Sequence, residues 1–156
     1  MRGDGDGWVF DADGQRYWGV HGAAGLLVTA PLDDAEGVAV LLQHRAVWSH
    51  QGGTWGLPGG ARDSHETVEE AAVREAEEEA GLSASDLEVT GALVTHRASS
   101  GWTYTTVVAR AAHRVATVAN LESAELRWVP VDEVAELPLH PGLARSWPTL
   151  LEQLTA

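Results

Sequence analysis

Three glutamates at helical spacing are the residues of this chain best suited to chemistry. Glu75, Glu78 and Glu79 occupy positions i, i+3 and i+4, which places their side chains on one face of a helix. Carboxylates this close repel one another unless a positive group lies among them. Mg²⁺ and Mn²⁺ prefer oxygen ligands. We therefore interpret this face as a site for a divalent cation; the alternative is an ordinary solvated helix face.

Composition limits the partners that this face could serve. The chain has 156 residues, of which 44% are hydrophobic, as expected for a single globular domain. Its net charge of −13 argues against binding polymeric nucleic acid or an anionic membrane, because both require clustered Lys and Arg. A small polyanion stays compatible if bound metal ions reverse the local charge.

Three features that the sequence lacks, namely cysteine, a long apolar run and a signal-peptide pattern, exclude further classes of protein. The chain has no cysteine, which excludes a disulfide scaffold and a thiolate zinc site. No apolar run approaches the length of a membrane span, and the N-terminus lacks a signal-peptide pattern. We therefore expect a cytoplasmic protein without membrane association, acting as a monomer or a homodimer.

The elements that must position the glutamates can be read from hydrophobic patterns and from glycine and proline. The helix should run from about Glu66 to Ala80, with Gly81 at its C-cap. Residues 1–7 should form a flexible tail, and residues 8–156 a single domain that opens with a hairpin turning at Asp13-Gly14. Strands are expected at residues 23–30, 38–42, 87–96, 102–112 and 126–131, and a last helix at 142–154. This order predicts an α/β fold with helices on both faces of a mixed sheet.

The spacing around the glutamates forms a longer signature. Gly60, five residues, Glu66, seven residues and then Arg74 lead into the glutamates, and Gly81 follows. Seven such positions match by chance about once in a hundred million start points at residue frequencies of 5–10%. The stretch resembles the Nudix box, GX5EX7REUXEEXGU with U a bulky aliphatic residue, and residues 55–60 resemble the usual lead-in. Ala76 departs from the pattern because it is smaller than the usual aliphatic residue.

The resemblance implies both a fold and a reaction. The Nudix fold is an α/β/α sandwich around a mixed β-sheet. The family hydrolyses a nucleoside diphosphate linked to another group, with Mg²⁺ or Mn²⁺ as cofactor. We expect a MutT-like member that converts a nucleoside triphosphate, including oxidised or non-standard ones, to the monophosphate and pyrophosphate. ADP-ribose or dinucleoside polyphosphate hydrolysis is the alternative within the enzymes, and a non-catalytic nucleotide-binding Nudix module is the alternative outside them.

Carried over position by position, the resemblance also implies site residues. Glu75, Glu78, Glu79 and the carbonyl of Gly59 would bind metal, and the three glutamates would serve catalysis. Glu66 lies nine residues before Glu75, on the other side of a regular helix. We therefore expect Glu66 to brace the junction of loop and helix, with Arg74 orienting the glutamates.

Candidates outside the box are less strongly marked. Glu125, just ahead of the strand expected at residue 126, could take the proton of the attacking water, with Glu122 as the second choice; both could equally be exposed loop acids. Arg45 could contact a substrate phosphate through its guanidinium, or simply end a strand at the surface. Trp48 could stack on a base, and Asn120 could bond a base edge, although packing and turn roles are common for these residue types.

Overall fold

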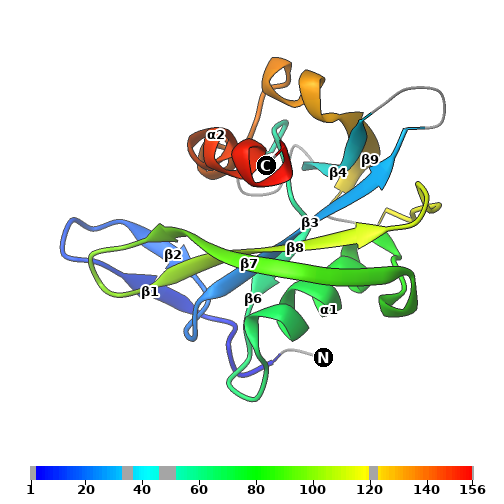
Figure 1. Ribbon diagram of the computed structural model, residues 1–156. Helices are drawn as coiled ribbons and strands as arrows, with labels where there is room; N and C mark the ends of the chain where they lie inside the picture. Colours follow the sequence, from blue (N-terminus) through cyan, green and yellow to red (C-terminus); the bar gives the residue numbers. More distant parts are fainter. Residues whose placement is uncertain (1–2, 33–36, 46–51, 120–122, 156) are drawn as a thin grey trace.

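The computed structural model describes residues 3–32, 37–45, 52–119 and 123–155. The strands along the chain are β1 (Trp8–Phe10), β2 (Arg16–Trp18), β3 (Ala23–Pro31), β4 (Val38–Arg45), β5 (Trp55–Gly56), β6 (Gly59–Ala61), β7 (Leu87–Arg97), β8 (Thr103–Ala111) and β9 (Ser123–Pro130). The helices are α1 (Val68–Ala80) and α2 (Pro141–Thr155), with short 3₁₀ helices η1 (Ala84–Asp86) and η2 (Val131–Glu136) (Figure 1).

A mixed sheet forms the centre of the fold. Its main path runs β5-β4-β3-β8-β7, with β6 paired to β3 and β9 paired to β4. The β3–β8 pair is parallel, whereas β4, β6 and β7 pair antiparallel with their neighbours. Residues 23–30 of β3 are all buried, because helices cover both of its faces. The uninterrupted apolar run of this strand, rather than an alternating pattern, is typical of such a position.

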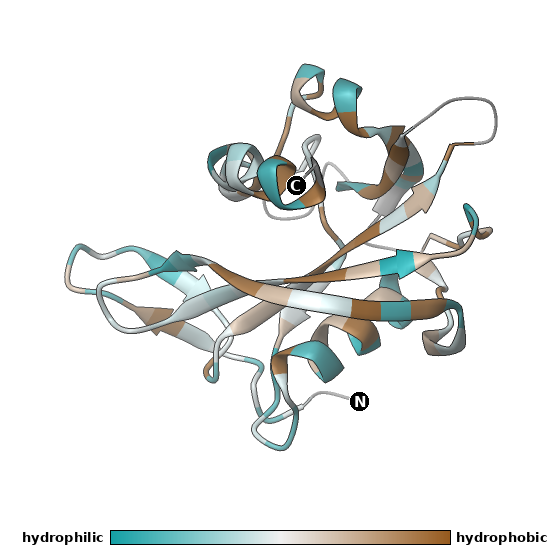
Figure 2. Cartoon of the chain, viewed as in Figure 1, coloured by the Kyte–Doolittle hydropathy of each residue, from teal (hydrophilic) through white to brown (hydrophobic). Residues whose placement is uncertain are grey.

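The two helices cover opposite faces of the sheet. Alanines on one side of α1, including Ala72 and Ala76, pack against a core that contains Leu26. Leu27, the next residue of β3, belongs to the second core, beneath Trp147 of α2. Figure 2 shows the brown, hydrophobic stretch of the central strands between the two helices. The expected α/β/α sandwich around a mixed sheet is therefore confirmed.

The boundaries of α1 follow from its capping residues. Thr67 is the N-cap and forms a capping box with Glu70: the Glu70 amide donates to the Thr67 hydroxyl at 3.1 Å, and the Thr67 amide donates to the Glu70 carboxylate at 2.9 Å. The helix thus begins at Val68, two residues later than predicted. It ends as predicted at Gly81, whose φ of 70° lies in the left-handed region that favours glycine.

The N-terminal residues form a small sheet of their own. Strands β1 and β2 pair antiparallel, with Trp8 opposite Trp18, which confirms the predicted hairpin. The segment before it was expected to be flexible, but its described part has defined partners: the Val20 amide donates to the Gly5 carbonyl at 2.8 Å, and the Gly19 amide donates to the Gly7 carbonyl at 2.7 Å. Among the described residues, no helix combines the length and the apolar character required to cross a membrane.

Candidate active site

A glycine pair opens the site between β5 and α1. Gly59 faces Gly25 in the β3–β6 register, and a Cβ at Gly59 would lie 2.5 Å from the Ala24 carbonyl oxygen. A Cβ at Gly60 would lie 2.6 Å from the carboxyl carbon of Glu75. Both values are too short for real contacts, so the missing side chains let β6 approach β3 on one side and α1 on the other.

The three box glutamates lie in different environments. Glu79 is 6% exposed, and its Oε2 accepts a hydrogen bond of 3.0 Å from the Gly59 amide. Glu75 is largely buried, and this burial, reinforced by the charge of Glu78, raises the pKa of Glu75 to about 7 even though Arg74 opposes the shift. Glu78 is exposed at the outer edge of the face.

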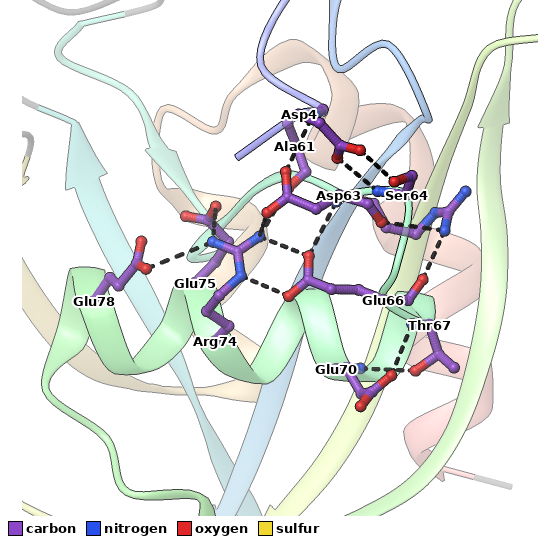
Figure 3. Close-up of polar contacts among 12 residues, drawn as sticks. Asp4, Ala61, Asp63, Ser64, Glu66, Thr67, Glu70, Arg74, Glu75 and Glu78 are labelled. Atoms are coloured by element: carbon purple, nitrogen blue, oxygen red, sulfur yellow. Dashed lines mark hydrogen bonds and ion pairs between the residues drawn. The ribbon is translucent and has the colours of Figure 1, made fainter. Parts of the chain in front are cut away.

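Arg74 lies among the carboxylates of Glu66, Glu75 and Glu78 (Figure 3). Its Nε donates to Glu66 Oε2 at 2.6 Å, and Nη2 donates to Glu66 Oε1 at 2.9 Å. Its Nη1 donates to Glu75 Oε1 at 3.0 Å and lies 3.5 Å from Glu78 Oε1. The hydrogen bonds with Arg74 hold the pKa of Glu66 below its ordinary value, and those with Glu66 raise the pKa of Arg74. The expected bracing contact between Glu66 and Arg74 is present.

The donor set suits a hard divalent cation. Glu75, Glu78, Glu79 and the Gly59 carbonyl offer only oxygen atoms, which Mg²⁺ and Mn²⁺ prefer. A cation would stabilise the charged forms of the buried Glu75 and Glu79 carboxylates. In the part of the chain that the structure describes, however, ligand atoms gather within 4.8 Å only at Asp63, His65 and Glu66.

The cluster of Asp63, His65 and Glu66 is a poor metal site, because both oxygens of the Glu66 carboxylate already accept hydrogen bonds from Arg74. We therefore keep Gly59, Glu75, Glu78 and Glu79 as the predicted ligands. In this arrangement the guanidinium of Arg74 supplies the positive charge between Glu75 and Glu78. The assignment of the metal face stays a prediction.

The candidates outside the box are placed as follows. Glu125 lies within β9, opposite His44, so its expected position in a loop ahead of the strand is wrong. Its Oε2 lies 3.0 Å from Nη2 of Arg127, and both side chains are about half exposed. Arg45 ends β4, and its amide donates to the Thr54 carbonyl at 2.9 Å. Trp48, Asn120 and Glu122 lie outside the described residues, and the roles of Glu125 and Arg45 stay predictions.

Two further residues lie at the site: Asp63, to which the sequence assigned no role, and Tyr104, which the sequence offered only as one of several aromatic residues that could stack on a base or pack in the core. Asp63, within the five-residue spacer of the box, is 7% exposed, and its Oδ2 lies 3.8 Å from Nη2 of Arg74. The Tyr104 hydroxyl lies where a Cβ at Gly25 would be 1.8 Å away, and burial together with the charge of Glu79 raises the pKa of Tyr104. A spacer position carries no sequence signal, whereas the alternation in residues 102–112 could have placed Tyr104 inward.

Comparison with known proteins gives the family. The model of the NUDIX domain matches residues 21–150. A Mycobacterium tuberculosis protein named "Putative 8-oxo-dGTP diphosphatase 3" is 64% identical over 154 residues, which are 96% of this chain and 70% of that protein. The crystal structure of a Nudix hydrolase from M. smegmatis, RenU, is 61% identical, with a TM-score of 0.93 over 97% of this chain and 96% of that chain.

A more distant structure agrees in fold. A C. elegans Ap4A hydrolase superposes with a TM-score of 0.69 at 19% identity, over 85% of this chain and 98% of that chain. At this identity the likeness concerns the fold alone. Together with the intact box and the sandwich described above, the family match and the two high-identity relatives lead to one conclusion. The chain belongs to the Nudix hydrolase family and is a Nudix-type pyrophosphohydrolase.

Proposed function

We propose that this enzyme hydrolyses nucleoside triphosphates, including oxidised ones, to the nucleoside monophosphate and pyrophosphate with Mg²⁺ as cofactor and Mn²⁺ as a substitute. The observation that carries the proposal is the relative named an 8-oxo-dGTP diphosphatase, which is 64% identical over 96% of this chain. The complete set of box glutamates supports turnover rather than passive nucleotide binding, because a non-catalytic module has no need of them.

The reaction adds water across the anhydride between the α- and β-phosphates and breaks one P–O bond. A bound divalent cation would neutralise the phosphate oxygens and position the water. Gly59, Glu75, Glu78 and Glu79 are the residues that would hold it. A carboxylate within reach must accept the proton of the water, and Glu75, Glu78 and Glu125 are the proposed candidates.

The phosphate and base ends of the substrate need further contacts. We propose that Arg45 binds a phosphate and that Trp48 and Asn120 contact the base. ADP-ribose and dinucleoside polyphosphates remain the alternative substrates; the Ap4A hydrolase neighbour does not favour them, since it shows the fold alone. The cytoplasmic location and the monomeric or homodimeric state also stay predictions.

The test is a hydrolysis panel with identified products. Purified enzyme is incubated with Mg²⁺ and 8-oxo-dGTP, the ordinary nucleoside triphosphates, ADP-ribose or dinucleoside polyphosphates, and products are resolved by ion-exchange chromatography. We expect 8-oxo-dGTP to give 8-oxo-dGMP and pyrophosphate with the highest kcat/KM. Preferred cleavage of ADP-ribose or a dinucleoside polyphosphate would overturn the substrate assignment.

Variants test the metal face in the same assay. Glu78→Gln and Glu79→Gln should each nearly abolish Mg²⁺-dependent product release while the fold stays intact. Glu152→Gln, an exposed glutamate of α2, is the matched control and should retain wild-type kcat. Full activity in both box variants would show that the metal face is wrongly assigned.

A further inference from the structure

We propose that residues 3–7 form an N-terminal strap that holds the spacer of the Nudix box, and that Asp63 is the positioning residue through which the strap fixes Arg74. The strap precedes the region matched by the NUDIX domain model, which begins at residue 21. The inference rests on the proposed function in one respect, namely that the glutamates contacted by Arg74 bind the metal.

The strap is bonded to the spacer directly. The Gly5 amide donates to Asp63 Oδ1 at 2.9 Å in a buried contact. One residue closer to the N-terminus, the Asp4 carboxylate accepts hydrogen bonds from both the amide and the hydroxyl of Ser64 (Figure 3). On its other side, the Gly5 carbonyl accepts from Val20 at 2.8 Å. The strap is therefore held between the hairpin and the box.

The close approach of the strap requires glycine. A Cβ at Gly5 would lie 2.0 Å from the carbonyl oxygen of Arg62, a backbone atom that cannot move aside by a rotamer change. A Cβ at Gly3 would lie 2.0 Å from the Asp63 carboxylate. Real Cβ atoms do not come this close to other heavy atoms. An alanine at Gly5 must therefore push the strap away from the box, whereas one at Gly3 would displace the Asp63 carboxylate.

Asp63 connects the strap to the acidic face. One carboxylate oxygen accepts from Gly5, and the other lies 3.8 Å from Nη2 of Arg74. The Asp63 amide donates to Glu66 Oε1 at 3.0 Å, the same oxygen that accepts from Arg74. Displacing the strap thus disturbs Asp63 and Glu66, the two carboxylates next to Nη2 of Arg74. The other terminal nitrogen of Arg74, Nη1, contacts Glu75.

Gly5→Ala is the test variant, and Gly91→Ala is its matched control. Gly91 lies on β7, and a Cβ there would meet open space. The readouts are the Mn²⁺ dissociation constant of the nucleotide-free enzyme by electron paramagnetic resonance and hydrogen exchange of the Arg74 Nε–H by NMR, with Arg74→Lys identifying the signal. Outer partners of metal ligands typically tune affinity by about 10- to 100-fold.

We expect Gly5→Ala to weaken Mn²⁺ binding by about tenfold and to accelerate exchange of the Arg74 Nε–H, while Gly91→Ala stays within about twofold of wild type. A lower Tm with unchanged Mn²⁺ affinity and unchanged exchange would show a merely structural strap and overturn the proposal. If Gly5→Ala does not fold, Asp63→Asn is measured in the same way, because it retains an acceptor for Gly5 and removes the charge facing Arg74.

The outcomes separate this inference from the proposed function. If the wild-type enzyme bound no Mn²⁺, the assigned metal face would fail. The strap would then be judged by the Arg74 Nε–H alone: faster exchange in Gly5→Ala than in Gly91→Ala supports the proposal, and equal exchange in both overturns it.

Discussion

Glu66→Gln should destabilise the protein through one pair of hydrogen bonds. Glu66 receives two bonds from the Arg74 guanidinium, at 2.6 and 2.9 Å, and its side chain is 8% exposed. Hydrogen bonds to charged groups contribute about 1.5–3 kcal/mol, and solvent at Arg74, whose side chain is 31% exposed, screens part of this. We therefore expect the free energy of unfolding to fall by about 2 kcal/mol, which lowers Tm by roughly 4–8 °C for a chain of this size.

The decrease in unfolding free energy caused by Glu66→Gln should depend on pH, and the shift in the pKa of Glu66 determines the direction of this dependence. Arg74 holds that pKa below the ordinary value of 4.5. A depressed pKa stabilises the folded state above the unfolded-state pKa, and this contribution disappears as the pH falls through the folded-state pKa. The stability difference between wild type and Glu66→Gln should therefore be constant near pH 7 and shrink progressively below about 4.5.

Urea unfolding followed by tryptophan fluorescence at a series of pH values measures this difference. Glu152→Gln, on the exposed side of α2, serves as the control and should follow the wild type throughout. A difference that is as large at pH about 3 as at pH 7 would refute the reasoning, because the destabilisation would then come from shape and neutral hydrogen bonding rather than from the ion pair.

Four further outcomes follow from the same geometry. Gly60→Ala places a Cβ 2.6 Å from the Glu75 carboxyl carbon, so kcat should fall by more than about tenfold in an enzyme that still shows a cooperative thermal transition. Because burial raises the pKa of Glu75 to about 7, its charge opposes folding above that pH, and Glu75→Gln should raise the Tm of the metal-free protein at pH 8. Thr67→Ala removes the N-cap and should cost about 1 kcal/mol in urea unfolding without changing kcat. Gly25→Ala should be strongly destabilising, and adding Tyr104→Phe should recover part of the loss in a double-mutant cycle, since the hydroxyl is the nearest obstacle at 1.8 Å.

The sequence predicted the parts of the site that local rules control. Helical spacing placed Arg74 within 3.0 Å of Glu75 and 3.5 Å of Glu78. Gly81 ends the helix as predicted, because its φ of 70° is a left-handed conformation that glycine adopts without strain. The helix α1 begins at Val68 rather than at Glu66 as predicted, and this difference also has a local cause. The Glu66 carboxylate is bonded to the Asp63 amide and to Arg74, and Thr67 rather than Glu66 has the side chain that caps the first turn.

The contacts that the sequence could not predict join distant segments. Gly5 and Asp63 are 58 residues apart. The glycine- and aspartate-rich composition of residues 3–7 is equally typical of a mobile tail, so it did not predict this contact. Glu125 belongs to a strand because β9 pairs with β4 as far as Arg45, and no local propensity favours a strand at residues 123–125. Such placements depend on pairing partners rather than on the residues themselves.

The parallel pairing of β3 with β8 also orders events during folding. The Thr29 hydroxyl donates to the Ala109 carbonyl across this pair although 80 residues separate them. The entropy cost of closing so long a loop must therefore be met before the contact can form. During synthesis, β3, β4 and the whole Nudix box emerge before β8 does. The alanine face of α1 packs on a core that includes Val107 and Ala109 of β8, so it remains incompletely covered until then. The sequence of the acidic face is therefore complete before β8, which supplies part of the core beneath α1, has been synthesised.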